Sequence, residues 1–232
     1  MEAMKGFPAN HFSLSIVDPP YGIGESGLTN KSRGLLATSR DYRAFAGHDL
    51  EPASREYFDQ LFRVSSAQII WGANHFITRI AKDSSCWIVW DKENGQTDFA
   101  DCELAWTSFS TAVRRFRYRW QGMLQQNMKN KEQRIHPTQK PVALYKWLLR
   151  NYAKPGDTIL DTHLGSQSSR IAAWDLGFDF TGYELDPDYF REGNERFERH
   201  RAQGNLFTPE DAPKPTQGGL FTEKLTETAP KS

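Results

Sequence analysis

Asp18-Pro19-Pro20-Tyr21 places a carboxylate, a rigid backbone and an aromatic ring within four residues. An aromatic amine is a weak nucleophile, because its lone pair is delocalised into the ring. The Asp18 carboxylate and the carbonyl of Pro19 can accept its two N–H groups and aim the lone pair at an incoming methyl group. The Pro-Pro segment fixes that carbonyl, and Tyr21 offers a flat face to an extruded base. The alternative is a Pro-Pro turn after a strand.

A second motif lies where an expected strand leads into a helix. Asp161–Ser166 (D-T-H-L-G-S) is a glycine-containing turn, and backbone amides at such turns approach ligands closely. Glu184 follows the next expected strand, at the place of the acid that binds ribose hydroxyls in nucleotide-binding folds. The alternative is the βα loop of any α/β protein.

A third motif, His136–Pro141 (H-P-T-Q-K-P), stands at the start of an expected helix. Thr138 or Gln139 can cap this helix, and Lys140 can meet a carboxylate. The alternative is a plain N-terminal cap with no further role.

Residues 113–134 combine many basic side chains with a single acid, Glu132. Phe116, Tyr118 and Trp120 alternate with arginines, as in a half-exposed strand. Arginines neutralise phosphates and read guanine edges, whereas the alternative is a solvated strand pair whose Arg stems cover apolar surface. The candidate DNA-binding residues are Arg114, Arg115, Arg117, Arg119, Lys129 and Lys131.

The elements around these motifs alternate between strands and helices. We expect strands at 12–17, 68–71, 86–90, 103–106, 158–161 and 180–183, and helices at 55–66, from Pro141 onward, at 168–176 and at roughly 187–201. This order predicts a doubly wound α/β sheet. Ligands bind outside the carboxyl ends of the strands in such sheets, so the position of Asp18-Pro19-Pro20-Tyr21 after a strand suits a site.

The composition bounds the function. The chain has 232 residues and a net charge of zero, so any DNA-binding surface is local. Cys86 and Cys102 lack metal-ligand spacing, so we expect no metal site, and free thiols fit a reducing cytoplasm. No apolar run approaches a membrane span and no signal segment stands at the N-terminus. We expect a cytoplasmic protein of a bacterium or phage-infected cell, with no membrane contact.

Together, the three motifs resemble those of the DNA amino-methyltransferases of the permuted β class. That family carries D-P-P-Y, a target-recognition segment, H-P-T-Q-K-P and a cofactor loop in this order, as this chain does over roughly residues 5–200. Trp71–Asn74 and Trp90–Lys92 resemble stretches of phage and prophage members. The resemblance implies a Rossmann-like mixed sheet of seven-strand type, S-adenosyl-L-methionine as methyl donor, and flipping of a base of double-stranded DNA.

The resemblance also assigns roles by position. Residues 1–202 form the catalytic domain, with the recognition segment at about 108–135. The expected catalytic residues are Asp18, Pro19, Pro20 and Tyr21. The residues expected around the cofactor are Thr138, Lys140, Asp161, Thr162, His163, Gly165, Ser166 and Glu184. Gln167 stands where the family usually has glycine, and we expect it to weaken the cofactor site without abolishing it.

Adenine N6 is the expected target, because cytosine-N4 enzymes usually have serine at the place of Asp18. Cytosine C5 chemistry is disfavoured, since neither cysteine follows a proline. Protein glutamine methyltransferases usually carry asparagine at that place and lack a basic insert. RNA is an alternative substrate. A catalytically impaired DNA-binding remnant is another alternative, suggested by Gln167 and by a family strand that would precede Met1.

The last stretch, 203–232, is expected to be a flexible tail. Gln203–Phe207 and Gln217–Phe221 repeat the pattern Gln-x-x-Leu-Phe, which resembles the peptide that docks bacterial DNA-processing proteins on the sliding clamp. A flexible segment can present Leu and Phe to a preformed apolar pocket, and two copies raise avidity. Alternatively, Leu206 and Phe207 pack on the domain. A homodimer is a further candidate assembly.

Overall fold

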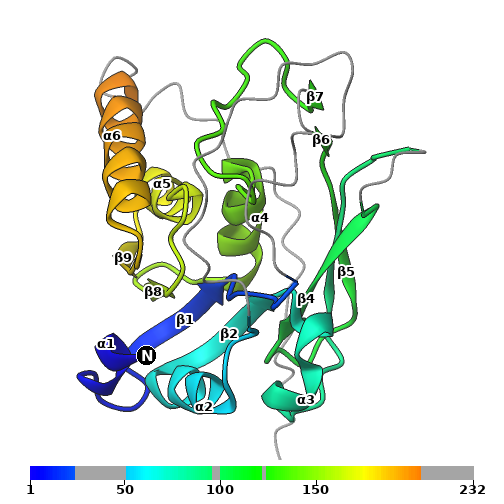
Figure 1. The fold of residues 1–232 in the computed structure, drawn as a ribbon, viewed down its shortest axis with the longest axis vertical. Coiled ribbons are helices and arrows are strands. Elements are labelled where there is room, and N and C mark those ends of the chain that lie inside the picture. Colours follow the sequence, from blue (N-terminus) through cyan, green and yellow to red (C-terminus); the bar gives the residue numbers. More distant parts are fainter. Residues whose placement is uncertain (24–50, 96–99, 122–123, 205–232) are drawn as a thin grey trace, which may run out of the picture.

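The computed structural model describes residues 1–23, 51–95, 100–121 and 124–204. Seven strands form one sheet in the order β5-β3-β4-β2-β1-β8-β9 (Figure 1). The strands are β1 (Phe12–Val17), β2 (Ser65–Trp71), β3 (Ile88–Asp91), β4 (Cys102–Thr107), β5 (Arg114–Arg117), β8 (Thr158–Asp161) and β9 (Asp179–Gly182). A separate hairpin pairs β6 (Trp120–Gln121) with β7 (Leu124–Gln125). The expected mixed sheet of seven strands is confirmed.

Helices cover both faces of the sheet (Figure 1). On one face lie α1 (Glu2–Lys5), α2 (Arg55–Val64) and α3 (Ile77–Ile80), with the 3-10 turn η2 (Ala73–His75) beside them. On the other lie α4 (Val142–Tyr152), α5 (Ser168–Leu176) and α6 (Pro187–Gly204). The protein is therefore a three-layer α/β structure.

The core lies on both faces of the central strands. Ile16 and Ile69 pack in the cluster that includes residues of α4, whereas their neighbours Val17 and Ile70 pack in the cluster that includes Phe58 of α2. Successive side chains of a strand point to opposite faces. A strand covered on both faces is mostly apolar on both, which explains the apolar pairs Ile16–Val17 and Ile69–Ile70 in β1 and β2.

Strand direction decides which residues meet. β4 runs antiparallel to β2 and β3, while β1 is parallel to β2 and β8, β3 is parallel to β5, and β8 is parallel to β9. The ends of six strands and the start of β4 therefore lie on one side of the sheet, here called the carboxyl edge. Asp18 after β1, Asp161 at the end of β8 and Glu103 at the start of β4 all lie there.

Two expectations on helix ends need correction. Neither Thr138 nor Gln139 caps α4, whose N-cap is Pro141. The amide of Val142 instead donates to the carboxylate of Glu132 at 3.1 Å, a partner that is distant in sequence. The last helix also runs to Gly204 rather than 201, so it includes the first two residues of the expected tail.

Two expected segments lie outside the described residues. The first is 24–50, where a sequence rich in Gly, Ser, Thr and Arg after the D-P-P-Y motif predicts a long loop, and the second is 205–232, which holds most of the expected tail. Among the helices that the structure describes, none combines the length and the apolar character needed to cross a membrane.

Candidate active site

The Asp18 carboxylate accepts contacts at both of its oxygens. The hydroxyl of Tyr21 donates to Oδ1 at 2.6 Å, and the ammonium of Lys140 lies 2.5 Å from Oδ2. The first and third sequence motifs thus meet at one carboxylate. Because an ionised carboxylate has about four lone-pair sites, Asp18 can accept further N–H donors.

Two glycines let the D-P-P-Y loop fit against its neighbours. Gly72 has φ +67°, and a Cβ there would come within 1.9 Å of the Tyr21 ring. Gly22 has φ +72°, and a Cβ there would come within 2.3 Å of Pro52. Both positions therefore require glycine for conformation and for space. Gly72 belongs to the W-G-A-N stretch, which forms part of the wall beside Tyr21.

The ring of Tyr21 stacks on His75, with centroids 4.9 Å apart and planes 11° from parallel. Burial raises the pKa of Tyr21 well above its usual value, and the charge of Asp18 raises it further. The phenol therefore stays protonated and remains a hydrogen-bond donor to Asp18. Since His75 covers one face, a base would have to stack on the opposite face.

Lys140 is buried between two acids. Its ammonium lies 3.0 Å from Oε2 of Glu103 as well as against Asp18, and Lys92 forms an ion pair with the other oxygen of Glu103. Burial alone raises the pKa of Glu103, but Lys140 and Lys92 outweigh it and hold that pKa at about 2. Burial alone lowers the pKa of Lys140, but Asp18 and Glu103 outweigh it and raise that pKa. Four alternating charges thus line the carboxyl edge.

Asp161 is buried beside the 162–167 loop. Its carboxylate accepts from the hydroxyl of Ser169 at 2.6 Å and from the amide of His163 at 2.9 Å, both of which are uncharged groups. Burial raises the pKa of Asp161 to about 7; those two hydrogen bonds lower it, and the charges of Asp18 and Glu184 raise it. A cationic ligand would stabilise the charged form of such an acid.

Glu184 joins the loop to the end of β9. One carboxylate oxygen accepts from the amide of Gly165 at 2.7 Å, and the other accepts from the amides of Leu185 and Asp186 at 2.9 and 3.0 Å. The backbone around Gly165 is therefore held close to the acid that sequence reasoning assigned to ribose hydroxyls. Ser166 of this loop, also expected at the cofactor, is buried.

The other expected cofactor residues lie around the same loop. Thr162 contacts the hydroxyl of Tyr57 at 2.6 Å and the ring of His163 at 3.0 Å. The hydroxyl of Thr138 lies 3.0 Å from Nδ1 of His136, whose ring packs edge-on against Tyr189. Burial lowers the pKa of both histidines to about 4, so both rings are neutral at pH 7.

Gln167 takes the conformation that a glycine would favour, with φ 61° and ψ 26°. Its side chain is fully buried and points away from the loop toward α6. The amide nitrogen donates to Asn194 at 3.0 Å and to the carbonyl of Phe190 at 3.2 Å, while Arg170 donates to its oxygen at 2.8 Å. The substitution keeps the backbone path of the loop and adds a contact between α5 and α6.

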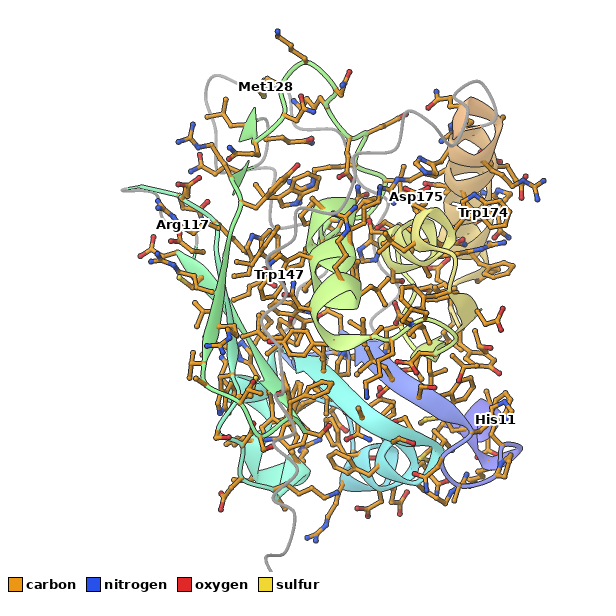
Figure 2. The ribbon with its side chains drawn as sticks, turned by 180° about the vertical axis from the view of Figure 1, so that it is seen from behind. His11, Arg117, Met128, Trp147, Trp174 and Asp175 are labelled. Carbon is orange, nitrogen blue, oxygen red and sulfur yellow. The ribbon has the colours of Figure 1, made fainter. Side chains whose placement is uncertain are left out.

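The candidate DNA-binding residues form an exposed face on an edge strand. In β5 and the residues after it, Phe116 and Tyr118 are half-buried, whereas Arg115, Arg117 and Arg119 are exposed, which confirms the expected alternation. Phe116 packs on Trp147 of α4, on the inner side of the strand from Arg117 (Figure 2).

The remaining basic residues differ in their surroundings. Arg117 pairs with Glu93 at 2.7 Å and lies 3.4 Å from Asp91. Arg114 is half-buried, and Lys129 and Lys131 are exposed after β7. Phosphate contacts at Arg117 would have to replace its ion pairs.

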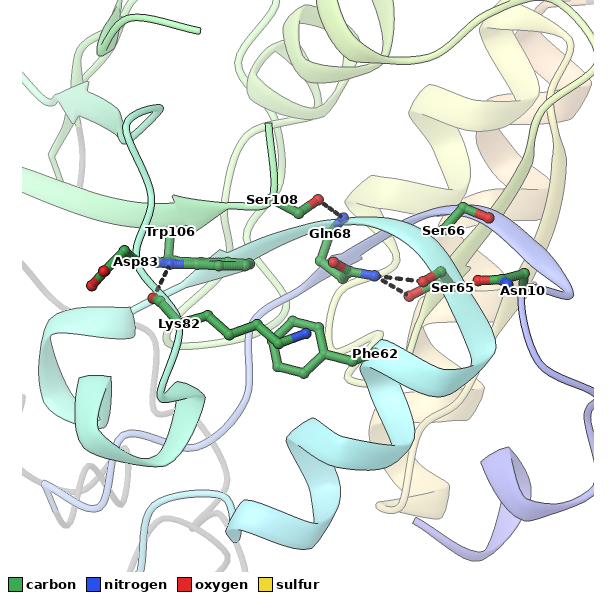
Figure 3. A pocket seen from close by; sticks show the side chains of 9 residues that line it. All are labelled: Asn10, Phe62, Ser65, Ser66, Gln68, Lys82, Asp83, Trp106 and Ser108. Carbon is green, nitrogen blue, oxygen red and sulfur yellow. Dashed lines mark hydrogen bonds between the residues drawn. The ribbon is translucent and has the colours of Figure 1, made fainter. Parts of the chain in front are cut away.

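A shallow hollow of about 350 Å³ lies between α2 and the strands β2 and β4 (Figure 3). Ser65, Gln68 and Lys82 are among its lining residues. Ser65 begins β2, whereas Gly72 beside Tyr21 follows its end. The hollow therefore lies at the opposite ends of the strands from the carboxyl edge. Within the described ranges, no three His, Cys, Asp or Glu side chains gather closely enough to hold a metal ion.

Three residues of the site were not predicted from the sequence: His75, Lys92 and Glu103. His75 and Lys92 lie in or beside the stretches W-G-A-N and W-D-K, which carried a resemblance but no assigned role. Glu103 was only part of an expected strand. Glu103 reaches the site because it lies at the start of a strand that runs antiparallel to its neighbours. The sequence does not reveal that direction, so it could not identify Glu103.

Sequence comparison finds similarity to DNA methylases. The family model of the N6/N4 type described as "DNA methylase" matches residues 89–195, which include the second and third motifs but not D-P-P-Y. The type II methyltransferase M.HpaI of Haemophilus parainfluenzae is 25% identical over 85% of this chain and 72% of its own length. The YubD protein of Escherichia coli (strain K12) is 24% identical over 91% of this chain and 96% of its own length.

A solved structure has the same fold. TTHA0409 of Thermus thermophilus, complexed with S-adenosyl-L-methionine, matches with a TM-score of 0.52 and 18% identity, over 86% of this chain and 92% of that one. The motif order, the seven-stranded mixed sheet and the match to the family model agree with one another. Over residues 89–195 this chain is similar to the N6/N4 DNA methylases, and the type II methyltransferase M.HpaI extends that similarity over 85% of the chain.

Proposed function

We propose that this DNA methyltransferase transfers a methyl group from S-adenosyl-L-methionine to N6 of an adenine that is flipped out of double-stranded DNA. The observation that carries this proposal is the Asp18 carboxylate, which Tyr21 and Lys140 hold at the carboxyl edge. Asp18 directly follows β1, which pairs in parallel with β8, and Asp161 ends β8. An acceptor for an amine and a site for a cation are therefore neighbours.

The base is oriented by the D-P-P-Y loop. Asp18 accepts one N–H of the amine and the carbonyl of Pro19 accepts the other, so that the lone pair is localised on the nitrogen and points at the incoming methyl group. Pro20 fixes the carbonyl, and Tyr21 stacks on the base. Lys140 supplies the counter-charge to Asp18, and Asp18 is placed to receive the proton that the methylated amine gives up.

The residues of the second motif fit the proposed cofactor. Asp161 is buried with two uncharged partners, so the ammonium or sulfonium of S-adenosyl-L-methionine would supply the cation that it lacks. The residues proposed to surround the cofactor are Thr138, Asp161, Thr162, His163, Gly165, Ser166 and Glu184. When bound, the cofactor supplies an electrophilic methyl group. Lys140, assigned to this group by sequence, is better explained by its contact with Asp18.

The DNA substrate would lie against the basic face of the recognition segment. Arg115, Arg117 and Arg119 are exposed along one side of the chain, and Lys129 and Lys131 follow. Local positive charge is what an overall neutral chain needs in order to bind phosphates. Arg114 is half-buried and we propose it as a weaker contact.

Cytosine N4 is the second candidate target, because the family includes both N6 and N4 enzymes. Asp18, rather than serine, favours adenine. The decisive experiment incubates the protein with S-adenosyl-L-methionine and mixed-sequence DNA, digests the DNA, and identifies modified nucleosides by mass spectrometry. We expect N6-methyladenine. N4-methylcytosine would replace the proposal by its alternative, and no modified base despite cofactor binding by calorimetry would indicate an impaired remnant.

Two proposals concern assembly. The repeated segments Gln203–Phe207 and Gln217–Phe221 are proposed to dock on a bacterial sliding clamp, which is supported by their shared Gln-x-x-Leu-Phe pattern. A pull-down with peptide 202–232, beside a version with alanine at both Leu-Phe pairs, tests this; equal capture by both peptides contradicts it.

A homodimer is the other candidate, and light scattering decides it.

A further inference from the structure

Arg196 of α6 reaches into the space between the 162–167 loop and the recognition segment, and only 10% of its side chain is exposed. Its Nη1 donates to the carbonyl of Ser166 at 2.6 Å and to the hydroxyl of Ser168 at 3.0 Å. Its Nη2 donates to the carboxylate of Glu132 at 2.8 Å. One guanidinium therefore holds the loop proposed for the cofactor and the segment proposed for DNA.

Glu132 is fixed equally firmly on its own side. Its carboxylate accepts from the amide of Val142, the first residue of α4, at 3.1 Å. The side-chain amide of Gln125 in β7 bonds both the backbone amide and the carbonyl of Glu132, each at 2.8 Å. The β6–β7 hairpin and α4 therefore both fix the position of Glu132. Helix α4 begins two residues after Lys140.

Separating Glu132 from Arg196 would leave two buried charges without partners. Burial raises the pKa of Glu132 and lowers the pKa of Arg196, and each charge opposes the effect of burial on the other. A buried charge that loses its partner is strongly destabilised. Glu132 is also the single acid in this basic stretch, so the recognition segment has no other carboxylate to offer Arg196.

We propose that the Glu132–Arg196 pair couples binding of the methyl donor to binding of DNA. A donor that orders the 162–167 loop fixes the carbonyl of Ser166, which fixes Arg196 and, through Glu132, the recognition segment. Coupling between two ligands is reciprocal, so DNA must strengthen donor binding by the same factor. Glu132 and Arg196 are positioning residues that touch neither ligand. This inference rests on the proposed function.

The test measures four dissociation constants for each variant of the full chain. S-adenosylhomocysteine is titrated with and without a short duplex of DNA that the enzyme methylates, and the duplex is titrated with and without S-adenosylhomocysteine. Glu132→Gln keeps an acceptor for Val142 but removes the charge that faces Arg196. The matched control is Asp175→Asn, which removes the charge that faces Lys146 and His200 (2.6 and 2.7 Å) in the same helical layer.

In the wild type we expect each ligand to lower the dissociation constant of the other by at least about fivefold. Glu132→Gln should bring this factor close to one, while Glu132→Asp, which keeps the charge, and Asp175→Asn should retain most of it. Should Glu132→Gln fail to fold, Arg196→Lys, which keeps the charge but loses the fork geometry, takes its place and should also lower the factor.

Three results would overturn the inference. They are an unchanged factor in Glu132→Gln, an equal loss in Asp175→Asn, and a wild type that binds both ligands independently. A wild type that does not bind S-adenosylhomocysteine at all would instead remove the proposed function, and the inference with it.

Discussion

The ammonium of Lys140 lies 2.5 Å from Oδ2 of Asp18, so an ion pair joins the H-P-T-Q-K-P and D-P-P-Y motifs. Lys140 has a second acid in reach, since Oε2 of Glu103 is 3.0 Å away. An amine that binds Asp18 can therefore take a share of the carboxylate without leaving Lys140 unpaired. This arrangement determines how variants of the site should behave.

Removal of the Asp18 carboxylate should abolish turnover and spare the cofactor site. We expect Asp18→Ala to lower the methylation rate at least about a hundredfold, because the amine loses its acceptor. Affinity for S-adenosyl-L-methionine should stay within error by calorimetry, since Lys140 keeps Glu103 as partner. Asp59→Ala, an exposed acid on α2, is the control. Wild-type turnover in Asp18→Ala would remove the assignment.

Removal of Lys140 should cost stability as well as activity. Lys140→Met leaves two acids facing each other without their shared cation, and loss of one partner of a buried pair costs about 3–5 kcal/mol. Urea unfolding measures this change. The double variant Lys140→Met, Asp18→Asn should recover part of the loss, because Glu103 keeps Lys92 as partner and the stranded charge of Asp18 is gone. A loss below about 1 kcal/mol would mean that water already shields the site.

Cofactor affinity should depend on pH through Asp161. With a pKa of about 7, this carboxyl is mostly protonated at pH 6 and mostly charged at pH 8. A cationic ligand favours the charged form, so affinity for S-adenosyl-L-methionine should rise as pH increases, approaching about tenfold per unit below pH 7. Asp161→Asn should bind weakly with a flat profile. A variant that retains the wild-type slope would locate the titrating group elsewhere.

Gln167 should matter for stability more than for the cofactor. Gln167→Gly relieves a left-handed conformation but removes buried hydrogen bonds to α6, for a net loss of about 1–2 kcal/mol. Cofactor affinity should be equal or better, because the side chain points away from the loop. Gln167→Asn, which tolerates the same conformation, is the control. Severalfold weaker binding by the glycine variant would mean that glutamine supports the cofactor directly.

The exposed arginines should set the salt dependence of DNA binding. Arg119→Glu or Arg117→Glu should weaken binding and reduce the slope of log K against log salt by about 0.9 for each lost phosphate contact. Arg55→Glu, an equal charge change on α2, should leave the slope unchanged. Anisotropy titrations at several salt concentrations provide the measurement. If only Arg55→Glu changes the slope, DNA binds on the other face.

Sequence reasoning succeeded where structure is local. The strand expected at 12–17 and the turn after it placed Asp18 correctly, and the helix expected at 168–176 is α5. The helix that follows H-P-T-Q-K-P begins one residue later than expected. Its amide partner is Glu132, and no local pattern identifies a capping acid from another segment.

Long-range geometry accounts for what was missed. Glu103 joins the site because β4 runs against its neighbours, which periodicity cannot reveal. The four-residue helices α1 and α3 are too short to show a helical repeat. The buried direction of Gln167 was also not foreseeable, because it depends on the space that Gly193 leaves in α6.

The sheet ends in β5, a strand of four residues of which three are arginines. The outer side of an edge strand carries unpaired backbone groups that can recruit a strand from another molecule, and charged side chains prevent this. The arginines proposed to contact DNA should therefore also protect this edge of the sheet from pairing with a strand of another molecule. Neutral substitutions made to weaken DNA binding should favour self-association, whereas charge reversal preserves the protection.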